Sequence, residues 1–321
     1  MLIPILLLVV GLVMLLFGGD IFIRGAASLA RKWNVSPIVI GLTVVAFGTS
    51  AAELVVNIFA AVNGTPDLAI GNILGSNISN ILLVLGVSAI IYPISVKQGT
   101  IWKEIPLGIM AVVVLFILSA DVYFGNGVIN ILTRGDGLIL LAFFVIFMYY
   151  TYGLTKVKGE DGGDIKKYSW PATISFVLLG LAGLVLGGKL LVDNGTIIAR
   201  LFGMSELFIG LTIVAIGTSL PELAASAIAA YRHHDDLAIG NVVGSNIFNV
   251  FWVLGLTPII SPIPVNSQAN TDVLVAILAA SLLFTFMFVG HKHHRFKLRR
   301  WQGVIFVLLY ISYLVFIGMR G

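Results

Sequence analysis

The chain has 321 residues, of which 59% are hydrophobic and 11% are charged, and its formal net charge is +4. A mean hydropathy of +1.05 excludes an ordinary soluble domain. The absence of cysteine excludes disulfides and thiolate metal sites.

Ten apolar segments follow one another along the chain. Each is long enough to cross a hydrocarbon core of roughly 30 Å, which takes about 20 helical residues. The sequence therefore predicts an all-α membrane protein with ten transmembrane helices. The predicted spans are residues 2–23, 37–61, 68–92, 104–120, 136–154, 171–192, 206–230, 237–261, 272–290 and 302–319.

The loops between these spans differ in basic content. The loops after spans 1, 3, 5, 7 and 9 hold 14 lysines and arginines, whereas the opposite side, with both termini, holds three. Cytoplasmic loops of membrane proteins carry the excess of basic residues. We therefore expect a multi-pass protein of the cell membrane with both termini external. The same distribution explains the net charge, so no nucleic-acid partner is expected.

The chain is organised as two related halves. The segment Gly41–Glu53 reappears as Gly210–Glu222, 169 positions later, and the segment Asp67–Asn80 reappears at the same offset as Asp236–Asn249 with 11 of 14 residues identical. Five spans per half is an odd number, so the second half must insert in the opposite orientation. We expect a first five-helix repeat over residues 1–155, a cytoplasmic linker over 156–169, and a second, inverted repeat over 170–321.

Each copy of the first segment places a carboxylate within a predicted span, at Glu53 and at Glu222. A carboxylate in hydrocarbon costs several kcal/mol unless it faces a cavity, pairs with a positive charge or binds a cation. No lysine, arginine or histidine lies deep in any span to neutralise the two acids. Two acids at equivalent positions favour a bound cation over a structural, protonated role.

The residues around these acids carry oxygen. Thr49 and Glu53 are spaced to face one side of a helix, as are Ser76 and Asn80, and Thr218, Glu222, Ser245 and Asn249 repeat this spacing in the second half. Carboxylate, hydroxyl and carbonyl oxygens without sulfur or imidazole suit calcium, sodium or magnesium rather than zinc or copper.

The helices that carry the acids are expected to be interrupted. Gly48 and Gly217 weaken them, and Pro221 removes an amide from the second. Irregular backbone at membrane depth is tolerated where it lines a cavity, and its carbonyls can bind ions. Because Pro221 interrupts only the second helix, we expect Gly48→Ala to be more harmful than Gly217→Ala.

Other functional classes fit less well. An intramembrane serine protease would need a histidine at the membrane site, and a metalloprotease would need a His-Glu-x-x-His helix, and the sequence has neither, so no enzyme is expected. A channel usually has a pore of identical subunits or parallel repeats, whereas inverted repeats favour alternating access. Exchange of calcium for protons remains the alternative to exchange for sodium, since a carboxylate can release calcium to either ion.

The two paired motifs, Gly48-Thr-Ser-x-x-Glu53 with Gly75-Ser-Asn-Ile-x-Asn80 and their second copies, resemble the two α-repeats of the calcium/cation antiporter superfamily, on its sodium/calcium exchanger branch. The resemblance covers essentially the whole chain. It implies a secondary active antiporter that exchanges three sodium ions for one calcium ion and needs no cofactor. We expect it to function as a monomer in the lipid bilayer.

The same resemblance implies roles for individual residues. Glu53 and Glu222 would be the central calcium ligands, and Thr49 and Thr218 would add backbone carbonyls. Flanking sodium sites would be formed by Ser50, Ser76, Ser219 and Ser245 with the carbonyls of Ala46 and Ala215. Spans 1 and 6 would slide to alternate access.

Two positions depart from the family's pattern. Ala52 stands where the family often has proline, so the break in span 2 would depend on Gly48 and packing. Asn249 stands where some relatives, notably the potassium-dependent exchangers, carry aspartate. The asparagine argues against potassium cotransport.

Overall fold

The computed structural model describes residues 2–63, 66–124, 129–156, 168–202, 215–289 and 296–320. Residues 157–167 of the predicted linker and residues 206–214 of the seventh predicted span lie outside the described residues.

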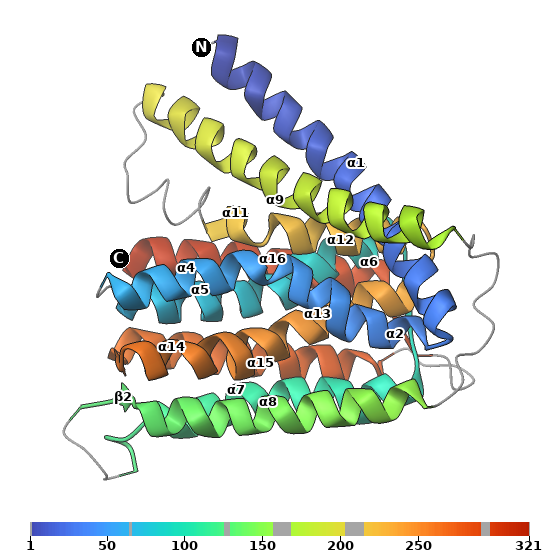
Figure 1. Cartoon of the computed structure of the whole chain (residues 1–321). Helices are drawn as coiled ribbons and strands as arrows, with labels where there is room; N and C mark the ends of the chain where they lie inside the picture. The colour runs from blue at the N-terminus through green and yellow to red at the C-terminus, as the bar shows by residue number, and fades with distance from the viewer. Residues whose placement is uncertain are drawn as a thin grey trace.

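Helices dominate both halves (Figure 1). The first half contains α1 (Leu2–Trp33), α2 (Pro37–Ile40), η1 (Gly41–Val45), α3 (Ala46–Thr49), α4 (Ala51–Val62), α5 (Pro66–Ser79), η2 (Asn80–Leu85), α6 (Gly86–Ile91), β1 (Ile94–Val96), η3 (Thr100–Glu104), α7 (Ile105–Leu118), β2 (Ile131–Leu132) and α8 (Arg134–Thr155). The second half contains α9 (Trp170–Leu201), α11 (Ala215–Thr218), α12 (Leu220–Tyr231), α13 (Asp235–Ile247), η5 (Phe248–Val253), α14 (Leu254–Ile260), β3 (Ile263–Pro264), α15 (Ser267–Phe286), β4 (Phe296–Leu298) and α16 (Arg300–Arg320). The elements labelled η are π-helical turns within longer helices.

Within the described ranges, eight helices are long and apolar enough to cross a membrane, and a ninth span is formed by residues 37–49 and 51–62 if that bent pair counts as one. Helices α11 and α12 form the described part of the seventh predicted span. The all-helical membrane fold is confirmed. Helices α1 and α9 extend about three turns beyond the predicted ends at residues 23 and 192, because their polar C-terminal parts continue the helix past the apolar stretch.

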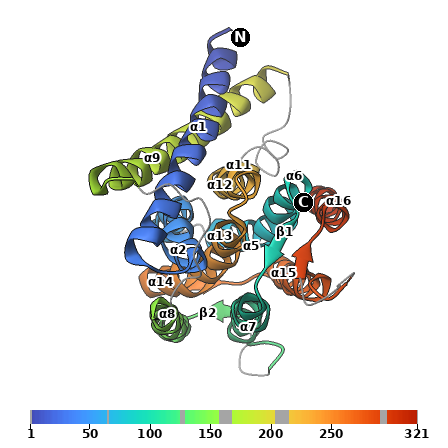
Figure 2. The same ribbon diagram turned by 90° about the vertical axis from the view of Figure 1, so that its right-hand side faces the viewer.

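Helices α1 and α9 form a crossing pair that is inclined to the other helices (Figures 1 and 2). The pair is antiparallel, since Lys32 near the end of α1 lies 4.7 Å above the ring of Trp170 at the start of α9. Glycines allow the close approach: a Cβ on Gly18 would lie 2.8 Å from the carbonyl carbon of Gly183. A Cβ on Gly180 would lie 2.5 Å from the backbone nitrogen of Phe22. No side chain fits at this crossing.

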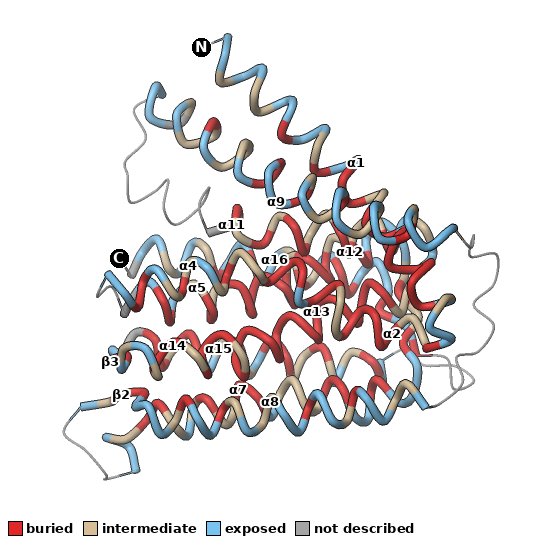
Figure 3. The backbone as a smooth tube through the Cα atoms, viewed as in Figure 1, coloured by how far each residue is buried: buried red, intermediate tan, exposed pale blue. Residues whose placement is uncertain are grey.

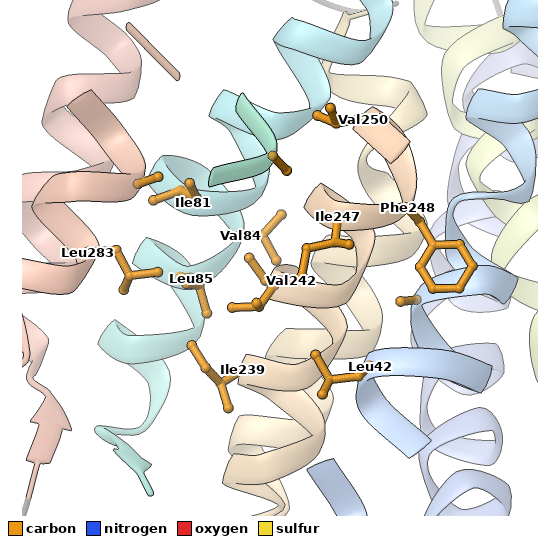
Figure 4. Close-up of a cluster of buried hydrophobic side chains, with 14 of the residues drawn as sticks. Leu42, Ile81, Val84, Leu85, Ile239, Val242, Ile247, Phe248, Val250 and Leu283 are labelled. Atoms are coloured by element: carbon orange, nitrogen blue, oxygen red, sulfur yellow. The ribbon is translucent and has the colours of Figure 1, made fainter. Parts of the chain in front are cut away.

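The interior of the bundle is formed by the third and eighth spans (Figure 3). In the most apolar 18-residue stretch of each helix, 94% of the residues are buried within Asp235–Ile260 and 78% within Leu68–Ile91, against 22% in α1 and in α9. Apolar side chains of α13, including Ile239 and Val242, face those of η2, including Val84 and Leu85 (Figure 4). Lipid chains are as apolar as these side chains, so close packing rather than transfer from water holds the helices together.

Two short antiparallel pairings join the halves. Strand β1 pairs with β4, and β2 pairs with β3. The starts of β1 and β3, Ile94 and Ile263, are 169 positions apart, the same offset as the sequence repeat. The β1–β4 pair joins the loops after spans 3 and 9, and Lys97 lies 3.1 Å from Asp236 in the first turn of α13, directly after the loop that follows span 7. These loops therefore share one face of the molecule, in agreement with the grouping expected from the basic residues.

Helix α1 also packs against α12, close to that face. The Asp20 carboxylate bridges two arginines, Arg24 on α1 at 2.8 Å and Arg232 at the end of α12. Beside this contact, a Cβ on Gly19 would lie 2.6 Å from Cδ1 of Ile228.

Candidate cation-binding site

Both helices that carry the central acids are interrupted at a serine. Ser50 separates α3 from α4 with φ −79° and ψ 5°, and Ser219 separates α11 from α12 with φ −89° and ψ 5°. The helix axis bends by 44° at Ser50. Proline at position 221 is therefore not required for the break, since Ala52 stands at the equivalent place in the first half. The predicted interruption is present in both halves.

The two acids begin the helices that follow these breaks, because each lies in the first turn of its helix. Glu53 and Glu222 are 0% exposed. The Oε1 atom of Glu53 accepts a hydrogen bond from Ser76 at 3.4 Å, and Oε1 of Glu222 accepts one from Ser50 at 3.3 Å. The second oxygen of each carboxylate is buried without a hydrogen-bond partner among the described residues. Buried polar atoms of this kind call for an explanation, and a bound cation supplies one.

Hydroxyl groups connect the two halves at this level. Ser50 of the first half donates to Glu222 of the second, and the hydroxyl of Thr49 lies 3.4 Å from that of Ser245. Ser219 is buried and its hydroxyl has no partner among the described residues. Among the predicted hydroxyl residues, the structure thus brings Ser76 to Glu53, Ser50 to Glu222 and Ser245 to Thr49.

The two predicted amide ligands lie at π-helical turns. Asn80 is the first residue of η2, and Asn249 is the second residue of η5. Both are 0% exposed. Each donates through its amide nitrogen, and the Oδ1 atoms of both are buried with no hydrogen-bond partner in the described part of the chain. Turns of the π type often occur at functional sites.

The remaining predicted ligands also lie beside the breaks. Ala46 and Ala215 are the first residues of α3 and α11, and Thr218 ends α11. The carbonyl of Ala46 accepts from the amide of Ser50 at 2.9 Å. The Thr49 side chain faces α13 and donates to Oδ1 of Asn241 at 3.1 Å.

The chemistry of these atoms matches a hard cation. Four acceptor oxygens, one from each of Glu53, Glu222, Asn80 and Asn249, are buried and unpaired among the described residues. In the same ranges no three histidine, cysteine, aspartate or glutamate side chains cluster as a metal site. Ligation would therefore combine two carboxylates with neutral oxygens, which suits calcium or sodium.

Three asparagines in this region were not predicted as functional residues. Asn77 and Asn246 hydrogen-bond the predicted amide ligands, and Asn241 anchors Thr49 and donates to Ser226 at 2.8 Å. All three belong to the duplicated segment, so the repetition of asparagine at equivalent positions was the available signal.

Two interrupted helices and two buried acids at a repeat interface define a cation transporter of the inverted-repeat class. A model of the sodium/calcium exchanger protein family matches residues 3–153 and 172–319, and the chain belongs to that family. It is therefore a cation/calcium exchanger and not an enzyme.

Relatives match over nearly the full length. The protein described provisionally as the antiporter CaxA of Alkalimonas amylolytica is 42% identical over 98% of each chain. The sodium/calcium exchanger MaX1 of Methanosarcina acetivorans is 30% identical over 97% of each chain. A solved structure of the sodium-calcium exchanger NCX_Mj superposes with a TM-score of 0.82 at 34% identity, covering 98% of this chain and 99% of the other.

Proposed function

We propose that this protein exchanges sodium for calcium across the cell membrane by alternating access, with three sodium ions per calcium ion and no potassium. The central observation is the set of four buried acceptor oxygens that have no hydrogen-bond partner in the described parts of the chain, because two of them are carboxylate oxygens contributed by opposite halves. A site between two inverted halves can be opened to either side of the membrane by movement of one part against the other.

The ligand assignment that we propose is the one that the family resemblance implies. Glu53 and Glu222 bind calcium, with carbonyls of Thr49 and Thr218. Sodium sites flank them and use the site serines and the carbonyls of Ala46 and Ala215. The amide oxygens of Asn80 and Asn249 contribute to binding of the transported ions, calcium included. The serine contacts to both acids, 3.3 and 3.4 Å long, support this placement of the hydroxyls.

The charge of the site predicts how transport responds to voltage. Two carboxylates give a fixed charge of about −2, which one calcium ion balances, whereas three sodium ions leave about +1. Moving one charge through 100 mV is worth about 2.3 kcal/mol, roughly a fifty-fold change in the attainable calcium gradient. An inside-negative potential therefore drives sodium in and calcium out.

Purified protein in proteoliposomes tests the exchange directly. Calcium flux is measured with a sodium gradient or a proton gradient as the sole counter-ion gradient, then with sodium in the presence and absence of potassium, where it should be unchanged, and then with sodium at a series of imposed potentials. We expect flux with sodium only, and a final calcium gradient that changes with potential. Flux driven by protons alone would establish calcium/proton exchange instead, and a gradient independent of potential would exclude the third sodium ion.

Substitution of the acids tests the site. Glu53→Gln or Glu222→Gln keeps the side-chain size but removes a charge from a desolvated cation site, so each alone should abolish or severely reduce calcium transport in folded protein. Glu104→Gln is the matched control. Glu104 is also a buried glutamate with one carboxylate oxygen unpaired among the described residues, but its other oxygen accepts from Tyr150 on α8 rather than from a serine of the duplicated segments. Normal flux in either site variant would exclude the assignment.

The proposed topology places both termini outside the cell and the linker 156–169 in the cytoplasm. The inverted repeats cover residues 1–155 and 170–321, and the protein functions as a monomer. The chain has no cysteine. Single cysteines introduced near the termini or in the linker can therefore be labelled in intact cells with a reagent that does not cross membranes. Labelling of the linker rather than the termini would reverse the orientation.

A further inference from the structure

Four asparagines meet where the third and eighth spans cross the centre of the molecule. They are Asn77 and Asn80 from the first half and Asn246 and Asn249 from the second, and none is more than 5% exposed. Their hydrogen bonds run between the halves. Asn80 Nδ2 donates to Asn246 Oδ1 at 3.0 Å, and Asn249 Nδ2 donates to Asn77 Oδ1 at 3.2 Å.

Two backbone carbonyls determine which way the amides of Asn77 and Asn246 face. The side chain of Asn77 lies 3.3 Å from the carbonyl oxygen of Asn246, and that of Asn246 lies 3.2 Å from the carbonyl oxygen of Asn77. A carbonyl oxygen only accepts hydrogen bonds, so each of these side chains must present its NH₂ group to it. Their Oδ1 atoms are then the acceptors.

The orientation of Asn80 and Asn249 follows from this arrangement. Since Asn77 and Asn246 present oxygen to them, Asn80 and Asn249 must present nitrogen in return. Their own Oδ1 atoms then point away from these bonds, and both are buried without a partner among the described residues. The two backbone carbonyls thus fix the orientation of all four amides, and they leave the Oδ1 atoms of Asn80 and Asn249 without a partner among the described residues.

We propose that Asn77 and Asn246 are positioning residues for cation binding, each holding the ligand asparagine of the opposite half with its oxygen toward the ion. The proposal rests on the proposed function, in which Asn80 and Asn249 bind the transported cations. Without its partner, an asparagine amide can turn over and present NH₂ to the site, and an NH₂ group repels a cation. The ligand of each half is therefore held by a residue of the other half.

Crossed pairing makes the proposal testable by double substitution. Asn77 acts through Asn249, and Asn246 acts through Asn80, although Asn77 and Asn80 are only three residues apart on one helix. Calcium affinity is measured for the four single alanine variants of Asn77, Asn246, Asn80 and Asn249. It is also measured for the four double variants that combine one positioning residue, Asn77 or Asn246, with one ligand residue, Asn80 or Asn249. A single positioning variant should raise the calcium KM by about two- to tenfold, the value of one hydrogen bond, and change the maximal rate less.

The expected pattern is specific. Asn77→Ala should add nothing in the Asn249→Ala background, whereas its effect should multiply with that of Asn80→Ala, and Asn246→Ala should show the reverse pattern. Equal effects in both backgrounds would show a merely structural role and overturn the proposal. If Asn249→Ala and Asn80→Ala leave calcium affinity unchanged, the ligand role itself fails, and with it this part of the proposed function.

The Asn249→Asp variant provides a second test that distinguishes loss of positioning from loss of folding. A carboxylate has two equivalent oxygens and needs no orienting partner, so Asn77→Ala should have little effect on calcium affinity in Asn249→Asp protein. Asn246→Ala should keep its full effect there, because it acts on Asn80. An undiminished effect of Asn77→Ala in the aspartate background would overturn the positioning role.

Discussion

The crossing of α1 and α9 gives a sharp prediction, because two glycines of α9 differ in what surrounds them. A Cβ on Gly180 would lie 2.5 Å from the nitrogen and 2.6 Å from the Cα of Phe22, far inside the normal contact distance of about 3.5–4.0 Å. A Cβ on Gly188 would have its nearest described neighbours at 3.9 Å, in Leu220 and Pro221. The same substitution, glycine to alanine, therefore meets backbone at one position and ordinary contact at the other.

The magnitude follows from the comparison. Alanine is favoured over glycine in a helix by about 1 kcal/mol at either position, so this gain cancels between the two variants. Overpacking costs about 1–3 kcal/mol, and at Gly180 the opposing atoms are backbone, which cannot rotate away. Gly180→Ala should therefore be about 1–3 kcal/mol less stable than Gly188→Ala.

Thermal unfolding of the two purified variants in one detergent measures this difference, with calcium flux as the functional readout. We expect Gly188→Ala to melt at or above the temperature of the unmodified protein, and Gly180→Ala to melt below it and transport more slowly. Equal melting temperatures would refute the close contact between α1 and α9.

Three further outcomes follow from the structure. A Cβ on Gly217 would overlap the side chain of Val192, whereas one on Gly48 would lie no closer than 3.3 Å to a side chain. Gly217→Ala should therefore reduce melting temperature and flux more than Gly48→Ala, the reverse of the order expected from Pro221. Burial, then the nearby Arg232, lowers the pKa of His234 below its usual value. Its protonation therefore costs stability as pH falls through about 6.5, the unfolded-state pKa, and His234→Gln should reduce the acid-induced fall in melting temperature. Arg232→Gln removes the ion pair that holds α1 against α12, so α1 should separate from α12 more often. A cysteine that replaces Ile228, which lies under α1, should then be labelled up to about fivefold faster. Arg24→Gln leaves the pair between Asp20 and Arg232 intact and should not change the labelling rate.

Much of the site could be predicted because the segments that form it occur twice in the sequence. Glu53 and Glu222 were recognisable because a carboxylate in an apolar span requires a partner, and the duplication excluded coincidence. The predictions for the site serines and for Asn80 and Asn249 followed from spacing along a helix and from resemblance, and the structure places Ser50 and Ser76 in contact with the acids.

Other features depended on contacts between distant parts of the chain. Asn77 and Asn246 accept hydrogen bonds from asparagines 166 to 172 positions away, which helix periodicity does not reveal. The effect of a side chain at Gly217 depends on Val192 of another helix. The length of α1 was underestimated because hydropathy falls at Asp20, yet pairing of Asp20 with two arginines offsets the cost of that charge and the helix continues.

The two halves are alike at the centre and different at the periphery, and this contrast bears on mechanism. The asparagine contacts are reciprocal, with matching bonds in both directions between the halves. Around α1 and α9 the symmetry is lost. Ile228 is partly buried beneath Gly19, whereas its equivalent, Phe59, is 63% exposed, and Asn63 stands where the second half has Arg232.

An inverted-repeat transporter must break its symmetry in this way, because a conformation with equal halves would be equally open or closed on both sides of the membrane. Here α1 is held against α12 at the face that carries Arg232, by Gly19 packing and by an ion pair with no charged counterpart at Asn63. The interface around the acids can stay symmetric while access changes, since the reciprocal asparagine bonds involve neither α1 nor α9. In the alternating-access mechanism that we propose, the ions therefore bind to one constant set of ligands. The position of the α1–α9 pair relative to the other helices determines which face of the protein is closed.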